Sequence, residues 1–265
     1  MLKDITIGQY YPSDSVIHKL DSRMKLIATF IFMISLFIIN KFWPYFIVLV
    51  FMVGIIKMSK IPMKYIFKGI KPLRWIILFT FVINIFFLPG DVIWSFGFMN
   101  ITRQGIEQAV FMAIRLILLV VGTSLLTLTT SPIELTDGIE RLLNPLKKVG
   151  LPVHELAMMM TIALRFIPTL LDETDKIMKA QMSRGADFES KNIINRAKNL
   201  VPLLVPLFVS AFRRADELAM AMEARCYRGG YNRTKMKEAL MTRNDYISCV
   251  IQIVYLGIII STRFI

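Results

Sequence analysis

Five nearly continuous apolar runs recur along the chain, separated by short polar or basic stretches. They cover residues 26–39, 45–56, 75–88, 106–128 and 246–260. Such runs are typical of helices that cross a bilayer, although several fall short of the about 20 residues that span its hydrocarbon core. Flanking lysines such as Lys25 can extend them to the headgroups. Arg115 in the fourth run is costly unless it is paired or snorkels to the headgroups. The pattern predicts five membrane-spanning helices.

Two predicted helix starts carry capping signals. Asp21 directly precedes the first apolar run and is a typical N-terminal cap. Ser131 is followed by Pro132 and by Glu134, which together match a capping box with proline in the first helical position. This signal predicts a short amphipathic helix from Pro132 to about Lys148, with leucine and isoleucine along one face.

A basic stretch separates the second and third runs. Six cations occur there without an acidic residue among them: Lys57, Lys60, Lys64, Lys68, Lys71 and Arg74. Their spacing of three or four residues predicts an amphipathic helix on the membrane surface. Because lysine and arginine accumulate on the cytoplasmic side, this stretch should lie inside. The loop at 89–101 has neither residue and should lie outside.

Two long helical stretches lie between the fourth and fifth runs, at about 154–187 and 199–230. Each begins apolar, contains proline, becomes charged and ends on an arginine between two small residues. The two arginine triplets are Ser183-Arg184-Gly185 and Ala224-Arg225-Cys226. Glycines at 185 and at 229–230 predict the helix ends.

The arginine of a single triplet is most simply a cation that offsets the helix macrodipole. Small neighbours, however, let a helix tip approach another surface closely, and a guanidinium forms forked bonds with a carboxylate. Two similar helices with the same kind of ending therefore favour docking to a partner over simple decoration of a helix end.

Composition excludes several classes of protein. Of 265 residues, 55% are hydrophobic and 19% charged, which is unusual for a soluble domain. The net charge of +13 follows the positive-inside rule and does not indicate nucleic acid, since no basic stretch is interleaved with aromatic residues. Two cysteines, Cys226 and Cys249, are too few for a disulfide framework. The polar first 25 residues predict no cleavable signal peptide.

Catalytic constellations are not visible in the sequence. His154 has no second histidine four residues on, so a zinc-protease motif is missing. The carboxylates within 172–175 adjoin Lys176 and Lys179, which indicates a solvated face and not an acid–base pair. The chain is therefore expected to be no enzyme, to bind no metal and to need no cofactor.

The pattern predicts an all-α, polytopic membrane protein in three parts. Residues 1–131 form a membrane domain with four spans, 132–230 a cytoplasmic domain of three helices, and 231–265 a linker and the last span. Twelve of the nineteen acidic residues lie between Glu134 and Glu223, so the cytoplasmic domain mixes both charge signs. A cytoplasmic N-terminus satisfies the charge asymmetry throughout.

With these features the chain resembles the transmembrane (T) component of energy-coupling factor (ECF) transporters, the EcfT family. The usual triplets of that family are Ala-Arg-Gly and a related Ala-Arg-small, from which this chain departs at Ser183 and Cys226, both small. The stretches 8–10, 18–26 and 226–230 are also similar to the family. A proline is common where Ser22 stands, and serine likewise suits a helix start.

The resemblance implies a coupling subunit of an importer for a vitamin or micronutrient. It would join two cytoplasmic ABC-type ATPases, which bind the ATP, to an S component that binds a vitamin or metal ion in the membrane. Arg184 and Arg225 would each insert into a groove of one ATPase and pair with acidic residues. Close approach would depend on the flanking residues Ser183, Gly185, Ala224 and Cys226. Motion of the coupling helices would let the S component reorient and release its substrate inside.

The length and layout of the chain resemble the shared T component, which serves several S components, more than the dedicated cobalt, nickel or biotin kinds. The alternative is the permease subunit of a conventional ABC importer, which usually couples through one short helix with a Glu-Ala-Ala-type loop. No such loop is visible in this sequence.

Overall fold

The computed structural model describes four stretches of the chain, residues 10–96, 99–188, 193–229 and 241–264. They divide into two compact units. The first unit holds the described residues up to Gly138 and those from 241 onward, and the second holds those from Ile139 to 229. The units divide within a helix, whereas the domain boundaries at 131 and 230 stay predictions. The predicted linker lies, up to residue 240, outside the described residues.

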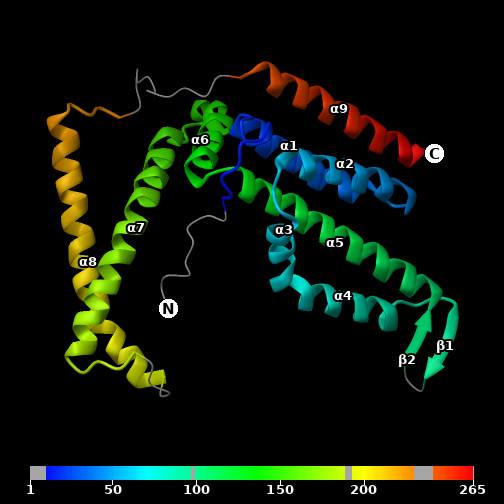
Figure 1. Ribbon diagram of the computed structural model, residues 1–265, viewed down its shortest axis with the longest axis horizontal. Coiled ribbons are helices and arrows are strands. Elements are labelled where there is room, and N and C mark those ends of the chain that lie inside the picture. Colours follow the sequence, from blue (N-terminus) through cyan, green and yellow to red (C-terminus); the bar gives the residue numbers. More distant parts are fainter. Residues whose placement is uncertain (1–9, 97–98, 189–192, 230–240, 265) are drawn as a thin grey trace. The chain divides into compact units, whose positions relative to one another are not determined.

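Helices make up nearly all of the described chain (Figure 1). The α-helices are α1 (Ser22–Ile38), α2 (Trp43–Ser59), α3 (Met63–Ile70), α4 (Arg74–Phe87), α5 (Arg103–Thr129), α6 (Pro132–Leu143), α7 (Val153–Ser183), α8 (Ile193–Ala224) and α9 (Arg243–Phe264). Two 3-10 turns, η2 (Lys71–Leu73) and η3 (Asn144–Val149), extend α3 and α6. The predicted all-α class is confirmed.

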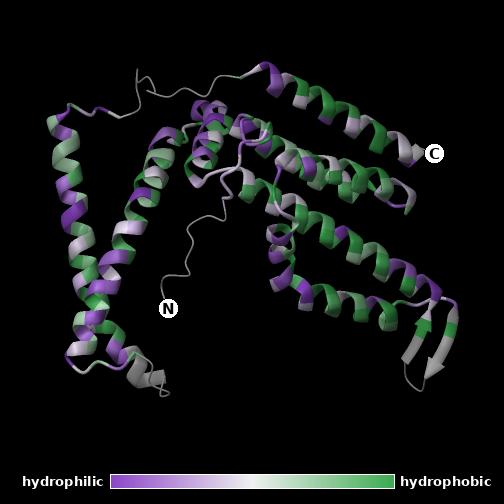
Figure 2. Cartoon of the chain, viewed as in Figure 1, coloured by the Kyte–Doolittle hydropathy of each residue, from purple (hydrophilic) through white to green (hydrophobic). Residues whose placement is uncertain are grey.

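Four helical segments of the described chain are long and apolar enough to cross a membrane. They are Met63–Phe87, Arg103–Thr129, Val153–Ser183 and Arg243–Arg263, with α2 as a shorter apolar helix. Hydrophobic residues dominate α2, α4, α5 and α9, whereas α7 and α8 mix them with hydrophilic ones (Figure 2). A polytopic membrane protein is confirmed. Helix α7, which was predicted to belong to the cytoplasmic domain with a first half in or under the membrane, also meets the criteria of length and composition.

The basic stretch 57–74 was predicted to form one amphipathic helix. In the structure it is divided between the end of α2, helix α3 and the turn η2. Helix α2 ends at Ser59, and Lys60 adopts the left-handed conformation with φ 55°. This conformation stops a right-handed helix, and Pro62 then occupies the N-cap of α3. In α3, Ile66 is buried while the lysines at 64 and 68 are exposed, so the helix has one apolar and one charged face.

The loop predicted at 89–101 contains a β-hairpin. Strand β1 (Val92–Phe96) pairs antiparallel with β2 (Met99–Thr102), and the register is irregular between Val92 and Trp94. The side chain of Gln104 closes the hairpin, since it accepts from the Asp91 N–H and donates to the Asp91 carboxylate, both at 2.8 Å. The hairpin joins α4 to α5, which pack together.

The start of α1 lies beside the end of α5. The Lys25 ammonium, predicted to reach toward the headgroups, is instead buried and donates to the Thr129 carbonyl at 3.0 Å and the His18 carbonyl at 2.8 Å. The Tyr11 N–H also donates to the Leu128 carbonyl. Carbonyls at a helix end have no partner within the helix, so the lysine satisfies the end of α5 and complements its dipole.

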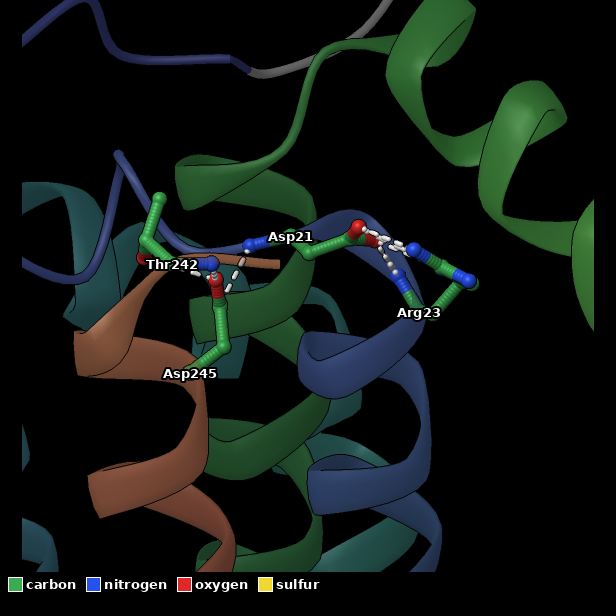
Figure 3. Close-up of polar contacts among 4 residues, drawn as sticks. All are labelled: Asp21, Arg23, Thr242 and Asp245. Carbon is green, nitrogen blue, oxygen red and sulfur yellow. Dashed lines mark hydrogen bonds and ion pairs between the residues drawn. The ribbon is translucent and has the colours of Figure 1, made fainter. Parts of the chain in front are cut away.

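A carboxylate links the first and last membrane helices (Figure 3). Asp245, which is 1% exposed in the first turn of α9, accepts from the Asp21 N–H at 2.8 Å and from the N–H and hydroxyl of Thr242. Asp21 caps α1 as predicted, accepting from the Arg23 N–H at 2.9 Å and pairing with the Arg23 guanidinium. Helices α1 and α9 therefore begin side by side and run parallel.

The charge of Arg115 inside α5 is satisfied at the opposite end of α1. Its guanidinium donates to the Ile39 carbonyl at 2.9 Å and to the Tyr45 hydroxyl at 3.2 Å. It also lies over the rings of Phe37 and Phe111. Of the two possibilities for this arginine, pairing or snorkelling, the structure shows pairing, with the carbonyl at the end of α1 as a partner.

Helix α6 begins with the predicted capping box. The Glu134 N–H donates to the Ser131 hydroxyl and the Ser131 N–H donates to the Glu134 carboxylate, both at 3.3 Å. After Leu143 the chain tightens into η3, since proline at 145 removes a donor of the α-helix. A Cβ at Gly138 would lie 2.8 Å from the Ser22 hydroxyl oxygen, so only glycine lets α6 approach the start of α1 this closely.

Replacing Arg115 by methionine should destabilise the first unit. The change removes two hydrogen bonds from a charged donor and leaves the Ile39 carbonyl unpaired, which costs about 1–3 kcal/mol. The thermal midpoint of the detergent-solubilised chain should fall. Arg103→Met is the control, because that side chain is 74% exposed and forms only a surface pair with Glu107. Equal midpoints for both variants would contradict the assigned role.

Replacing Asp245 by alanine should loosen α9 from α1. The change leaves the N–H groups of Asp21 and Thr242 without a charged acceptor, a loss of about 1.5–3 kcal/mol. Limited proteolysis near residue 241 should become faster, and Asp245→Asn should be affected less because one acceptor oxygen remains. Asp14→Ala, which removes a surface pair with Lys19, should leave the cleavage rate unchanged.

Candidate functional site

The two arginine triplets lie at the C-terminal ends of α7 and α8, in the second unit. Helix α7 ends at Ser183 and α8 at Ala224, a few residues before the predicted ends at about 187 and 230. Helix α8 also starts at Ile193, earlier than predicted. Both helices contain proline, at 168 in α7 and at 202 and 206 in α8. The sequence therefore located the ends of both helices to within six residues, less than two turns.

The end of α7 is closed by two backbone hydrogen bonds. The Ala186 N–H donates to the Gln181 carbonyl and the Gly185 N–H to the Met182 carbonyl, both at 3.0 Å. This pair of bonds is the Schellman motif, in which the residue after the C-cap is left-handed. Gly185 occupies that position with φ 89°, and Arg184 is the C-cap itself.

The end of α8 repeats this arrangement residue for residue. The Tyr227 N–H donates to the Met222 carbonyl at 3.0 Å and the Cys226 N–H to the Glu223 carbonyl at 2.8 Å. Arg225 takes the place of Arg184, and Cys226, with φ 55°, takes the place of Gly185. The two triplets therefore hold their arginines at the same position of the same cap. The sequence similarity corresponds to one shared backbone geometry.

Both arginines face solvent. Arg184 and Arg225 are exposed, and neither guanidinium forms a hydrogen bond or ion pair with any of the described residues. Their donors are thus free for a carboxylate on another molecule, in the forked geometry that arginine prefers. In Figure 1 the C-terminal ends of α7 and α8 lie at opposite ends of this helix pair. The two tips are therefore presented apart and do not form one joint site.

An ion pair joins the two helices. The Arg214 guanidinium on α8 donates to the Glu173 carboxylate on α7 at 3.1 Å, with side chains 36% and 25% exposed. Each of these residues lies 11 positions before the arginine at the tip of its helix, about 16 Å at the usual rise. The ion pair therefore joins the two helices at a point that is equally far along the chain from each tip. Glu173 was predicted to lie on a solvated face, so this partner was missed.

His154 contacts a carboxylate of the same unit. Its Nδ1 lies 3.0 Å from a carboxylate oxygen of Glu140, which joins α6 to the start of α7. Among the described residues, no group of three or more histidine, cysteine or acidic side chains is placed to hold a metal ion.

Comparison with known proteins identifies the family. A family model described as cobalt transport protein matches residues 13–236. The chain is 59% identical over 265 residues to the energy-coupling factor transporter transmembrane protein EcfT of Clostridium kluyveri, covering 99% of this chain and 98% of that one. The chain belongs to the EcfT family. It is a transmembrane component of an ECF transporter, embedded in the membrane.

Other EcfT relatives match over nearly the full length. The EcfT protein of Ruminiclostridium cellulolyticum is 57% identical, over 100% of this chain and 99% of that one. That of Bacillus subtilis is 50% identical, over 97% of each. The resemblance to the EcfT family is therefore confirmed. Residues 8–9 and 230, which carry part of that resemblance, lie outside the described residues.

Exchanging glycine and cysteine at the left-handed position after each arginine should change the stability of the two helix ends in opposite directions. Cys226→Gly removes the strain of a side chain at φ 55° and should stabilise the end of α8 by about 1 kcal/mol. Gly185→Cys should destabilise the end of α7 by a similar amount. Amide hydrogen exchange of the last helical turn measures both effects. A change of the same sign in both variants would contradict the shared cap.

Proposed function

We propose that the chain couples two ABC-type ATPases to a membrane S component and transmits their ATP-driven motion. The observation that carries this proposal is the repeated cap, which presents Arg184 and Arg225 in the same geometry on two helices. One ATPase would dock at each tip through acidic residues in a groove. The small residues Ser183, Gly185, Ala224 and Cys226 leave room for the groove wall.

The opposite placement of the tips supports two separate docking partners. A single ATPase that held both arginines would need them close together, whereas α7 and α8 end apart (Figure 1). The Arg214–Glu173 pair connects the helices between the tips. When one ATPase moves relative to the other, the two tips would therefore move together with helices that this ion pair joins.

A second surface suits the S component. Helix α8 exposes a run of large apolar side chains: Leu200, Val201, Leu204, Val205, Phe208, Val209 and Phe212. An exposed apolar run of this extent usually marks an interface with protein or lipid. Helix α7 exposes a separate group near its start, Leu156, Met159 and Met160, and methionine adapts to surfaces that re-pack. We assign these exposed apolar side chains to the membrane-embedded partner.

The remaining properties follow from this role. The N-terminus and the second unit face the cytoplasm, since the lysines of α3 and the ATPases belong there. The chain is not an enzyme and needs no cofactor, because the ATPases bind the ATP. The S component selects the substrate, a vitamin or micronutrient. The layout favours a shared T component. The names of the EcfT relatives specify no substrate.

Reversing the charge at both tips should uncouple the ATPases. In Arg184→Glu combined with Arg225→Glu, like charges would face each other at each contact, a loss of about 3–5 kcal/mol. The ATPases should no longer co-purify with the chain and S component, or should hydrolyse ATP without uptake. Arg213→Glu is the control, because Arg213 is an 81% exposed arginine of α8 away from the tip.

Three results would be informative. Normal assembly and uptake in the double variant would overturn the docking role of the arginines. Loss of assembly in Arg213→Glu as well would indicate a general effect of charge. Assembly with a soluble substrate-binding protein, and not with an S component, would favour the conventional ABC permease.

A further inference from the structure

A cavity of about 400 Å³ lies in the first unit between α1, α2, α5 and α9. This volume falls in the range of small-molecule pockets, about 300–1,000 Å³. Buried apolar side chains form its inner wall: Met24, Phe32, Met52 and Leu125. Exposed apolar side chains form its rim: Val50, Met58, Ile247 and Ile251. The cavity therefore opens onto a surface suited to lipid and not to water.

The cavity lies near one face of the membrane. Its lining comes from the starts of α1 and α9 and from the ends of α2 and α5, which lie on the same side. Gln252 on its wall is seven residues beyond Asp245, about 10 Å deeper along α9. One turn further, the stacked rings of Phe51 and Tyr255 join α2 to α9, with centroids 4.3 Å apart. The cavity therefore lies at the end of the unit where α1 and α9 begin and α2 and α5 end.

Several polar side chains, among them Lys25, Gln252, Asn244 and Ser248, line part of this mostly apolar space. Gln252 is 8% exposed, and its amide forms no hydrogen bond with any of the described residues. Lys25 is 5% exposed and uses two of its three N–H donors on the carbonyls of His18 and Thr129. An amide that lines an apolar cavity without a partner can donate to a ligand there, and apolar cavities do not hold water stably. The site therefore calls for a ligand that is mostly hydrocarbon with oxygen acceptors at one end.

We propose that this cavity binds an acyl chain of a membrane phospholipid, with Gln252 and Lys25 donating to its ester oxygens. The apolar walls match the hydrocarbon, and the donors of Lys25 and Gln252 match the carbonyl oxygens of a lipid ester. The exposed rim of Met58 and Ile251 gives entry from the bilayer without passage through water. With the orientation proposed above, the lipid comes from the cytoplasmic leaflet. The site itself depends only on residence of the chain in the membrane.

Photo-crosslinking tests the site directly. The full chain is reconstituted in vesicles with a phosphatidylglycerol whose acyl chain carries a diazirine, and labelled peptides are mapped by mass spectrometry. Labels should concentrate on cavity residues such as Phe51 and Met58, in excess of those on exposed lipid-facing Phe79 of α4. Gln252→Leu should lower the cavity label about fivefold, because one hydrogen bond is lost.

A pair of glycine substitutions supplies the matched control. A Cβ added at Gly54, which lines the cavity, meets nothing within 4 Å, so leucine there should extend into the space without disturbing the fold. Gly257 on α9 is equally open but does not line the cavity. Gly54→Leu should reduce the cavity label about tenfold, and Gly257→Leu should not change it. Equal labelling of both variants, or no excess over Phe79 in the wild type, would overturn the proposal.

Discussion

The Asp245 carboxylate determines how the membrane part of the chain closes. It binds the backbone N–H at the cap of α1, 224 residues earlier in the chain, while holding the start of its own helix. A carboxylate this deeply buried is stable only when its lone pairs are satisfied, and here backbone and hydroxyl donors do so. The first and last helices must therefore start together. The wall of the lipid cavity depends on this alignment.

Much of the membrane unit could be predicted because its signals are local. The apolar runs are continuous in the sequence, and the aspartate cap of α1 and the capping box of α6 each involve residues within four positions. The hairpin after α4 was missed, since its residues are apolar and aromatic without clear alternation. The break at Lys60 was missed because a lysine rarely adopts positive φ. The inward turn of Lys25 depends on carbonyls brought by α5, which no local pattern reveals.

The tips were predictable by residue type but not by geometry. Small residues around an arginine indicated a place of close approach, and both tips are exposed as that interpretation requires. That Cys226 would take the conformation of a glycine could not be read from its identity, because the cap forms around the backbone. The Arg214–Glu173 contact joins residues 41 positions apart, and its charges equally suited a solvated face.

The two caps have a mechanical consequence. Because backbone hydrogen bonds close each helix beyond its arginine, the last turn resists unwinding when the tip is pulled. Cα and carbonyl of the arginine then move with the helix axis as one body, so pulling and pushing are transmitted alike. A tip that ended in irregular coil would extend before it moved the helix. Each of these helices can therefore transmit both pushing and pulling during closure and opening of the ATPases.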